Sequence, residues 1–273
     1  MTEGEGAFDR AIAVRQDREG RMAVLLDATW TAPAGLNGGY IAAVVLNAMV
    51  AVVGDPARHP RSITLQYLAS PQPGPAVVEV AIERSGRTLT STSARLVQDG
   101  RTSIIALGVL AGDYESAVQF ATPPPPMPAS DDVPVLDWGT DLFPIATMFD
   151  YRPAIGPVPL RDAPAPEAVT GGWLRLKEPR APDAQLLAQY VDAWWPAAFV
   201  RVSRPAAVPT IDLTVHFRAP TTAAALDPAA PVMVRFTSRT AKDGFVEEDG
   251  EVWAPDGTLL ATSRQLAVAR LMT

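Results

Sequence analysis

Residues 39–53 read GYIAAVVLNAMVAVV and decide the fold, because this stretch has the character of a helix that is apolar on every side. A helix of this kind is normally buried within a protein rather than packed by one face only. The stretch is shorter than the roughly 20 residues that a membrane span requires, and Asn47 interrupts it. We therefore expect a helix enclosed by other structure, in a protein without membrane insertion.

Runs of strand character follow this helix. They cover residues 62–69, 76–84, 88–98 and 101–110, and the last two are joined by Asp99-Gly100. Asp-Gly between two such runs indicates a hairpin, because both residues tolerate positive φ. The first half of the chain is thus predicted to be one buried helix with an antiparallel sheet.

The second half repeats this order. Residues 184–202 (AQLLAQYVDAWWPAAFVRV) read as a helix, which Pro196 must kink or end in its first part. Predicted strands follow at residues 210–218, 231–239, 245–254 and 258–269, the last two joined at Asp256-Gly257. Because the same elements recur in the same order, we interpret the chain as an internal repeat with an α+β layout.

A proline-rich segment separates the two copies. Residues 121–170 hold 12 of the 27 prolines, a density that disfavours helices and sheet ladders. The segment also carries aromatic residues, which argue against a free tether: Trp138, Phe143, Phe149 and Tyr151. We divide the chain into a first unit at residues 1–112, a linker at 113–169 and a second unit at 170–273.

Composition excludes several kinds of chemistry. The 273 residues carry a net charge of −7, so general binding of nucleic acid is disfavoured. There is no cysteine and there are only two histidines, His59 and His216, which excludes a thiol nucleophile and a His-rich metal centre. Catalysis would have to use carboxylates, hydroxyls, amides, backbone dipoles or a cofactor. The amino-terminal residues do not resemble a secretory signal, so we expect a cytoplasmic protein.

The strand at residues 210–218 has the clearest alternation in the chain. Its odd-numbered apolar residues share one face, and its even-numbered polar residues share the other. The pattern predicts one wet face that carries Thr210, Asp212, Thr214 and His216.

Three further places could carry chemistry, and each has a plain structural interpretation beside the functional one. Asn37-Gly38-Gly39 is either a helix N-cap or a set of N–H groups that stabilise an anionic oxygen. Asp192, in YVDAWWP, is either solvated or desolvated with a raised pKa that suits a base. Gln265 is a strand glutamine whose side chain can act only through hydrogen bonds.

From residue 30 to residue 270 the chain resembles the double hotdog acyl-CoA thioesterases, specifically the bacterial acyl-CoA thioesterase II group. The resemblance rests on NGGYIAAVVLNA and SITLQYLASPQPGP in the first half, and on YVDAWW, PTIDLTVHFRAP and GEVWAPDGTLLATSRQLAVAR in the second. It implies two tandem hotdog units, each a long helix wrapped by a curled antiparallel sheet. It also implies hydrolysis of a fatty or small acyl-CoA to the free acid and coenzyme A.

In the resembled family an Asp, a Thr and a Gln hold and activate a water. These roles fall on Asp192, Thr210 and Gln265. The resemblance implies no metal and no cofactor, since coenzyme A is part of the substrate. We further expect the acyl chain to lie against Trp194 and Trp195, and the amides of Gly38 and Gly39 to serve as candidate oxyanion donors.

Two other functions stay open. A hotdog enoyl-CoA hydratase would need a His five residues after its Asp, but position 197 is alanine. A non-catalytic acyl-CoA-binding or assembly protein is the second alternative, and the complete set of Asp, Thr and Gln argues against it. Fusion of two hotdog units makes the usual dimer internal, while edge strands leave a homo-oligomer open.

Overall fold

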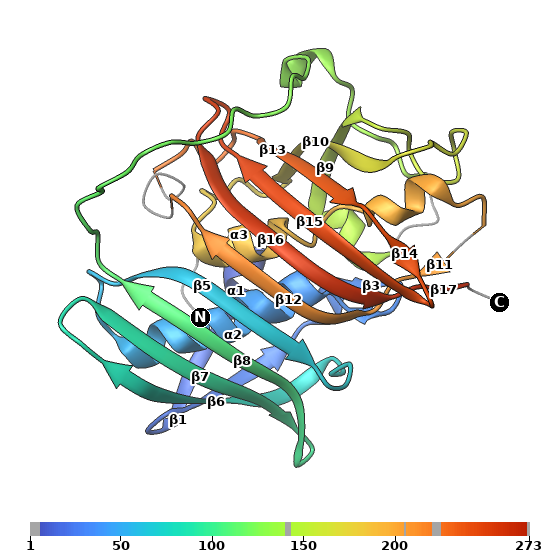
Figure 1. The fold of residues 1–273 in the computed structure, drawn as a ribbon. Coiled ribbons are helices and arrows are strands. Elements are labelled where there is room, and N and C mark those ends of the chain that lie inside the picture. The colour runs from blue at the N-terminus through green and yellow to red at the C-terminus, as the bar shows by residue number, and fades with distance from the viewer. Residues whose placement is uncertain (1–5, 140–142, 205, 220–224, 272–273) are drawn as a thin grey trace.

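The computed structural model of the chain describes residues 6–139, 143–204, 206–219 and 225–271. Within these residues, thirteen strands form one antiparallel sheet, and the helices lie against one of its faces (Figure 1). The strand order is β1-β2-β6-β7-β8-β5-β12-β16-β15-β13-β10-β9, and β14 pairs with β15 off this path. Figure 1 shows the sheet curling around the helices behind it. The protein is therefore α+β with a large antiparallel sheet and few helices.

The first half of the chain contains two α-helices, a 3-10 turn and eight strands among its described residues. Their bounds are α1 Ala7–Ile12, β1 Val14–Arg18, β2 Arg21–Leu26, η1 Ala28–Trp30, β3 Thr31–Ala32, β4 Gly35–Leu36, α2 Gly38–Val53, β5 His59–Tyr67, β6 Gly74–Ser85, β7 Leu89–Gln98 and β8 Arg101–Ala111.

The second half contains one α-helix with three 3-10 turns and nine strands among its described residues. Their bounds are η2 Ser130–Asp132, η3 Pro144–Met148, β9 Phe149–Ile155, β10 Ala168–Leu176, α3 Ala184–Tyr190, η4 Ala197–Arg201, β11 Ala206–Ala207, β12 Thr210–Phe217, β13 Val232–Ser238, β14 Ala241–Lys242, β15 Phe245–Trp253, β16 Leu259–Val268 and β17 Arg270–Leu271.

The two halves of the sheet have matching strand orders when they are read outwards from their junction. The junction is the antiparallel pair β5–β12. From β5 the order runs β8, β7, β6, β2, β1, and from β12 it runs β16, β15, β13, β10, β9. Along the chain, the helix of each half comes between corresponding strands of the sheet. Helix α2 comes between β2 and β5, and α3 comes between β10 and β12. The repeat seen in the sequence is thus a repeat of structure.

Helix α2 has the all-round burial that its sequence predicts. Every residue from 39 to 46 is buried. Asn37 caps the helix, because its side-chain oxygen accepts a hydrogen bond from the Tyr40 N–H. The predicted hairpin is also confirmed, since Asp99 and Gly100 have φ of 50° and 74° in the turn between β7 and β8. The helix and its sheet bury the core of this half.

Helix α3 is shorter than the sequence predicts. The expected helix over residues 184–202 is wrong beyond Tyr190, where the chain enters a turn before the 3-10 segment η4. Pro196 has no N–H to donate to the Asp192 carbonyl, and the residue before a proline disfavours helical geometry. The Asp192 carbonyl accepts a hydrogen bond from the Asn37 side chain instead, at 2.8 Å. Asp192 consequently lies just past the helix and not inside it.

The proline-rich segment includes a strand that the sequence did not reveal. After β8 the chain runs as an extended segment towards the other half (green in Figure 1). Within residues 113–169, expected to be linker, β9 pairs with β10 at the edge of the sheet. Tyr151 on β9 is 3% exposed, and its hydroxyl donates to the Ala193 carbonyl at 2.9 Å. This segment is thus tied to the second half of the chain.

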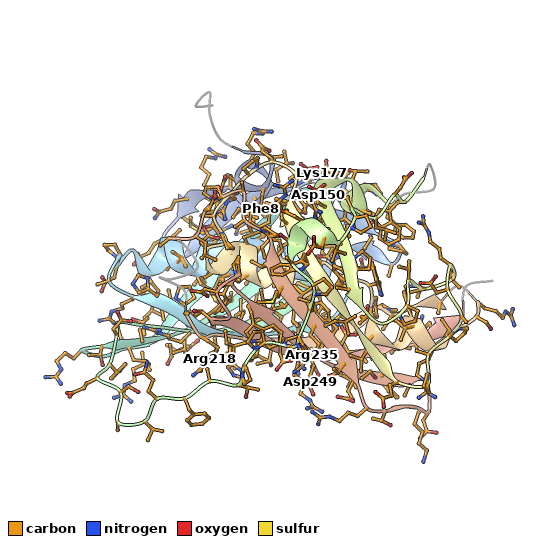
Figure 2. The ribbon with its side chains drawn as sticks, turned by 90° about the horizontal axis from the view of Figure 1, so that it is seen from above. Phe8, Asp150, Lys177, Arg218, Arg235 and Asp249 are labelled. Atoms are coloured by element: carbon orange, nitrogen blue, oxygen red, sulfur yellow. The ribbon has the colours of Figure 1, made fainter. Side chains whose placement is uncertain are left out.

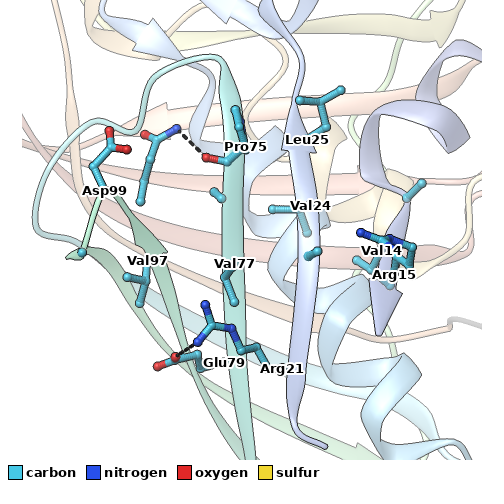
Figure 3. A pocket seen from close by; sticks show the side chains of 15 residues that line it. Val14, Arg15, Arg21, Val24, Leu25, Pro75, Val77, Glu79, Val97 and Asp99 are labelled. Atoms are coloured by element: carbon cyan, nitrogen blue, oxygen red, sulfur yellow. Dashed lines mark hydrogen bonds and ion pairs between the residues drawn. The ribbon is translucent and has the colours of Figure 1, made fainter. Parts of the chain in front are cut away.

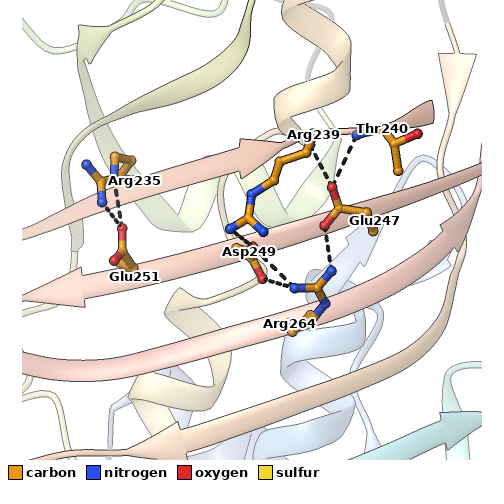
Figure 4. Close-up of polar contacts among 7 residues, drawn as sticks. All are labelled: Arg235, Arg239, Thr240, Glu247, Asp249, Glu251 and Arg264. Carbon is orange, nitrogen blue, oxygen red and sulfur yellow. Dashed lines mark hydrogen bonds and ion pairs between the residues drawn. The ribbon is translucent and has the colours of Figure 1, made fainter.

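The outer face of the second half carries ion pairs. Arg264 on β16 pairs with both Glu247 and Asp249 of β15, and Arg235 on β13 pairs with Glu251 (Figure 4). Figure 2 places Arg235 and Asp249 on the side of the sheet opposite Phe8, which belongs to the core. The charged side chains of these ion pairs therefore point away from the helices. Separately, no helix in the described part of the chain has both the length and the apolar character needed to cross a membrane.

The start of α2 and the end of α3 approach each other very closely at Gly39. A methyl group at this position would lie 2.8 Å from the Ala188 carbonyl oxygen and 2.9 Å from the Gln189 carbonyl oxygen. Both neighbours are backbone atoms of α3, which cannot turn aside as a flexible side chain would. Glycine at position 39 is what allows the two helices to meet.

We predict that Gly39→Ala destabilises the protein by about 1–3 kcal/mol, the usual cost of forcing an extra carbon into a packed core. Gly86→Ala is the matched control, because the new methyl group would meet only the Leu89 carbonyl oxygen at an ordinary 3.5 Å. Urea unfolding of the two variants measures the difference. Equal stabilities for both variants would show that the helices do not depend on this contact.

Candidate active site

Asp192 lies where the two halves of the chain meet at the helices. Its Oδ2 atom accepts hydrogen bonds from the Gly39 N–H at 2.8 Å and from the Asn37 side-chain amide at 2.9 Å. The carboxylate follows the C-terminal end of α3, where negative charge is disfavoured, and faces the N-terminal end of α2, where it is favoured. The start of α2 thus holds a carboxylate that belongs to the other half.

Asn37 connects these elements through all of its side-chain polar atoms. Its amide nitrogen donates both to the Asp192 carboxylate and to the Asp192 carbonyl. Its oxygen accepts from the Tyr40 N–H at 3.0 Å and from the Gln189 side chain at 2.9 Å. The N-cap predicted from the sequence is present, but its second function is to fix the backbone and side chain of Asp192.

Burial raises the pKa of Asp192 from 3.8 to about 6. Desolvation is the main cause, and it is opposed in order by hydrogen bonds from Gly39, Asn37, Gly38 and Gln265. A carboxyl group with this pKa is ionised at pH 7 but is more basic than an ordinary aspartate. Asp192 is half-buried, so of the two interpretations left open by the sequence the structure favours the partly desolvated aspartate.

Thr210 and Gln265 are neighbours across β12 and β16. The Thr210 hydroxyl donates to the Gln265 Oε1 atom at 3.1 Å, and Gln265 is only 7% exposed. Gln265 is also among the groups that lower the pKa of Asp192, so its carboxamide faces that carboxylate. The structure therefore brings the three residues of the predicted catalytic set together.

Thr210 is not on the wet face of its strand, so this part of the sequence interpretation is wrong. The register of β12 against β16 shifts between Thr210, which pairs with Ala267, and Asp212, which pairs with Leu266. The extra residue, Ile211, is a β-bulge that turns Thr210 to the inner face with Leu213. Strict alternation cannot reveal a bulge, and so it placed Thr210 with Asp212, Thr214 and His216.

Glu248 is a site residue that sequence reasoning missed. It lies on β15, is 6% exposed, and its Oε1 atom accepts from the Gln265 Nε2 atom at 2.8 Å. The Ala197 N–H donates to its other oxygen. A signal was present in the sequence, because Glu248 has the same parity along the strand as the buried residues Val246 and Val252.

Tyr67 brings a hydroxyl from the first half to the same place. It lies at the end of β5 and donates to the Gly38 carbonyl at 2.7 Å. Burial raises the pKa of Tyr67 well above its usual value, and the negative charge of Asp192 adds to this effect. The tyrosine therefore stays neutral and is available only as a hydrogen-bonding group.

The residues predicted to donate to an oxyanion or to line the acyl pocket are already hydrogen-bonded or packed against other residues. The Gly39 N–H, a candidate oxyanion donor, is already bonded to Asp192, and the Gly38 N–H faces the same carboxylate. Trp194 and Trp195 are 6% and 9% exposed, with ring centroids 4.4 Å apart, and both contact Tyr151. The Trp194 ring nitrogen donates to Thr170 at 3.0 Å. The pair forms part of a packed aromatic cluster.

Two surface cavities lie away from this cluster of polar groups. The larger, of about 730 Å³, is a groove over β1, β2, β6 and β7 bordered by Arg21, Leu25 and Glu79 (Figure 3). The smaller, of about 330 Å³, lies between residues 6–9 and residues 176–180. Neither is lined by Asp192 or Gln265. No cluster of three or more metal-ligating side chains occurs among the residues that the structure describes.

Comparison with known families gives two matches that together span most of the chain. The model for the acyl-CoA thioesterase N-terminal domain matches residues 26–111, and the model for the acyl-CoA thioesterase C-terminal domain matches residues 119–269. The two matches divide the chain on either side of residues 112–118, close to the end of β8.

Solved structures and a curated protein are also similar to this chain. A conserved protein of unknown function with a hotdog fold from Alicyclobacillus acidocaldarius is 27% identical, with a TM-score of 0.88 over 98% of this chain and 100% of that one. A proposed thioesterase II from Thermobifida fusca YX is 27% identical, with a TM-score of 0.82 over 97% of each chain. An uncharacterized Mycobacterium tuberculosis protein is 29% identical over 89 residues, and this match spans about a third (31%) of its length.

The buried carboxylate predicts a pH-dependent stability. The pKa of Asp192 is about 6 in the folded protein and 3.8 for the free group. The folded protein therefore binds this proton more tightly than the unfolded chain does. Stability is then lost as the pH rises from about 4 to about 6, by roughly 3 kcal/mol for two pKa units. Asp192→Asn stays neutral, so its unfolding free energy relative to wild type should increase by about that amount between pH 4 and pH 7.

Urea unfolding of both proteins across this pH range checks the prediction. Asp131→Asn, on an exposed 3-10 turn, serves as the control and should follow wild type at every pH. A constant difference between Asp192→Asn and wild type from pH 4 to pH 7 would mean that the carboxylate is not desolvated.

Proposed function

Since the chain belongs to the acyl-CoA thioesterase family, we propose that it hydrolyses acyl-CoA thioesters to the free acid and coenzyme A. The observation that carries the proposal is the half-buried, desolvated carboxylate of Asp192, which faces the Gln265 carboxamide beside the Thr210 hydroxyl. A thioester carbonyl is electrophilic and its thiolate leaves readily, so hydrolysis does not require a covalent serine or cysteine. A water activated by general base catalysis is sufficient.

In the proposed mechanism Asp192 is the general base. As the water oxygen forms its bond to the thioester carbonyl carbon, the π electron pair of the carbonyl moves onto its oxygen, and one water proton passes to the Asp192 carboxylate. The π pair returns in the next step to re-form the carbonyl. The carbon–sulfur bond then breaks, the electron pair leaves with sulfur, and Asp192 returns the proton to the thiolate. Thr210 and Gln265 orient the water, and this positioning supplies much of the acceleration.

The role of the α2 start follows from its contacts. Because the Gly39 N–H donates to Asp192, we assign it to the stabilisation of the base and not to a developing oxyanion. Gly38 faces the same carboxylate and belongs to the same arrangement. Together they keep Asp192 ionised at neutral pH although its surroundings are desolvated.

The matching strand orders support an interpretation of the fold as two tandem hotdog units. In this interpretation α2 and α3 are the two central helices, β9 belongs to the second unit, and the chain between β8 and β9 connects the units. We further propose that the acyl chain binds beside Trp194 and Trp195, that the protein acts in the cytoplasm, and that acyl-CoA is its substrate. A homo-oligomer and the length of the acyl chain are left open by these residues.

Release of free coenzyme A from a panel of acyl-CoAs of different chain length tests the proposal. We expect wild type to be active and Asp192→Asn to lose about 10²-fold or more in kcat, the scale of a lost general base. A hydratase would instead consume the double bond of an enoyl-CoA without release of coenzyme A. A non-catalytic binding protein would do neither.

Asp212→Asn is the matched control for Asp192→Asn. Asp212 lies two residues after Thr210 but on the other side of the bulge, and it should therefore keep wild-type kcat. Wild-type activity in Asp192→Asn would remove this residue from its role as base. Circular dichroism of each variant checks that a loss of activity does not reflect unfolding.

A further inference from the structure

Glu248 is a buried carboxyl group, and no positively charged residue in the described part of the chain is among the groups that shift its pKa. Among the described residues it is bonded to the Ala197 N–H through one oxygen and to Gln265 through the other. The charged groups that act on it are Asp192 and Glu247, and both are negative. Such a group is costly to ionise in these surroundings, and a hydrophobic residue of similar volume would avoid that cost. Its presence therefore calls for a function.

The arginines of the neighbouring strands are directed to the other face. Arg264 on β16 is bound to Glu247 and Asp249, and Arg235 on β13 is bound to Glu251. Figure 4 shows these pairs on the outer side of the sheet. These two arginines are thus not placed to neutralise Glu248, whose hydrogen bonds among the described residues come from neutral donors.

The Gln265 carboxamide has two chemically different ends, and its neighbours distinguish them. Its oxygen accepts from Thr210, while its nitrogen donates to Glu248 and faces Asp192. A carboxamide can rotate by 180° with little change in shape, so only its hydrogen-bond partners determine which end points where. Without Glu248, one of the groups that fix this direction is lost.

We propose that Glu248 is a positioning residue, whose carboxyl group fixes the direction of the Gln265 carboxamide between Thr210 and Asp192. This rests on the proposed function, in which Gln265 orients the water that Asp192 activates. Glu248 does not touch the substrate in this scheme. It acts through Gln265 alone.

The chemistry of the carboxyl group explains why an amide cannot replace it. The two oxygens of Glu248 accept hydrogen bonds from two different N–H donors, on Ala197 and Gln265. A glutamine at position 248 offers only one acceptor oxygen, so one donor must face an NH₂ group. Glu248→Gln therefore preserves size but loses either the contact with Gln265 or the contact with η4.

Protonation of Glu248 provides an independent signal. Burial raises the pKa of Glu248 from 4.5 to about 8, opposed by the hydrogen bonds from Ala197 and Gln265 and increased by the charge of Asp192. Above this pKa the carboxylate accepts from the Gln265 nitrogen, while below it the carboxyl proton competes for the same position. The side-chain amide of Gln265 should therefore sense this titration.

A double-mutant cycle tests the proposal. At pH 9, where Glu248 is ionised and accepts from Gln265, we expect Glu248→Gln to lower kcat about tenfold or more with KM within about twofold, as for a misoriented catalytic group. The pair Glu248→Gln with Gln265→Ala should be no slower than Gln265→Ala alone, because Glu248 acts through Gln265. Glu251→Gln, on the outer face of the same strand, is the control and should keep wild-type kcat. Wild-type kcat in Glu248→Gln, or losses that multiply in the double variant, would overturn the proposal.

NMR of glutamine side chains labelled with ¹⁵N gives a readout that needs no activity. In wild type the Gln265 NH₂ signals, assigned by their loss in Gln265→Ala, should shift with an inflection near pH 8. This titration uses the unaltered protein, so it decides the matter even if Glu248→Gln does not fold. Signals that stay constant from pH 6 to pH 9 would contradict the proposal. If wild type releases no coenzyme A but the NMR inflection is present, the proposed function fails while the positioning by Glu248 stands.

Discussion

The site depends on one interaction, the contact between the Asp192 carboxylate and the first residues of α2. A carboxylate buried from water loses its hydration, and this loss must be compensated by fixed donors if the group is to stay ionised. The Gly39 N–H and the Asn37 side chain supply those donors at 2.8 and 2.9 Å. Because they belong to one half of the chain and Asp192 belongs to the other, neither half contains the arrangement by itself. The absence of a side chain at Gly39 and the early end of α3 are both conditions for this contact.

The strands of the second half show how one sheet gives carboxyl groups different properties. Three acidic residues on the outer face of β15 each pair with an arginine: Glu247, Asp249 and Glu251. Glu248 points inward, where burial raises its pKa to about 8. A glutamate is thus part of a surface ion network at position 247 and a buried group with a raised pKa at position 248. The face of the strand decides which.

Local patterns in the sequence were sufficient for most of the fold. The buried helix α2 and the hairpin at Asp99-Gly100 follow from hydrophobicity and turn chemistry, which act over a few residues. Features that depend on tertiary contacts were not predictable in this way. The turn after Tyr190 is stabilised by Asn37 from the other half, and the bulge at Ile211 shows only in the register of β12 against β16. For the site, family resemblance supplied Asp192, Thr210 and Gln265. It did not supply Glu248, although strand parity indicated an inward direction.

The most direct test of this account is the titration of Asp192 itself. Wild type labelled with ¹³C at the aspartate carboxyl carbons, with the signal of Asp192 assigned by its loss in Asp192→Asn, reports the pKa of this one group. The account predicts a midpoint near pH 6, which reflects a desolvated carboxylate held by the start of α2. A midpoint close to 4, as in a solvated aspartate, would contradict the central claim that Asp192 is a desolvated base.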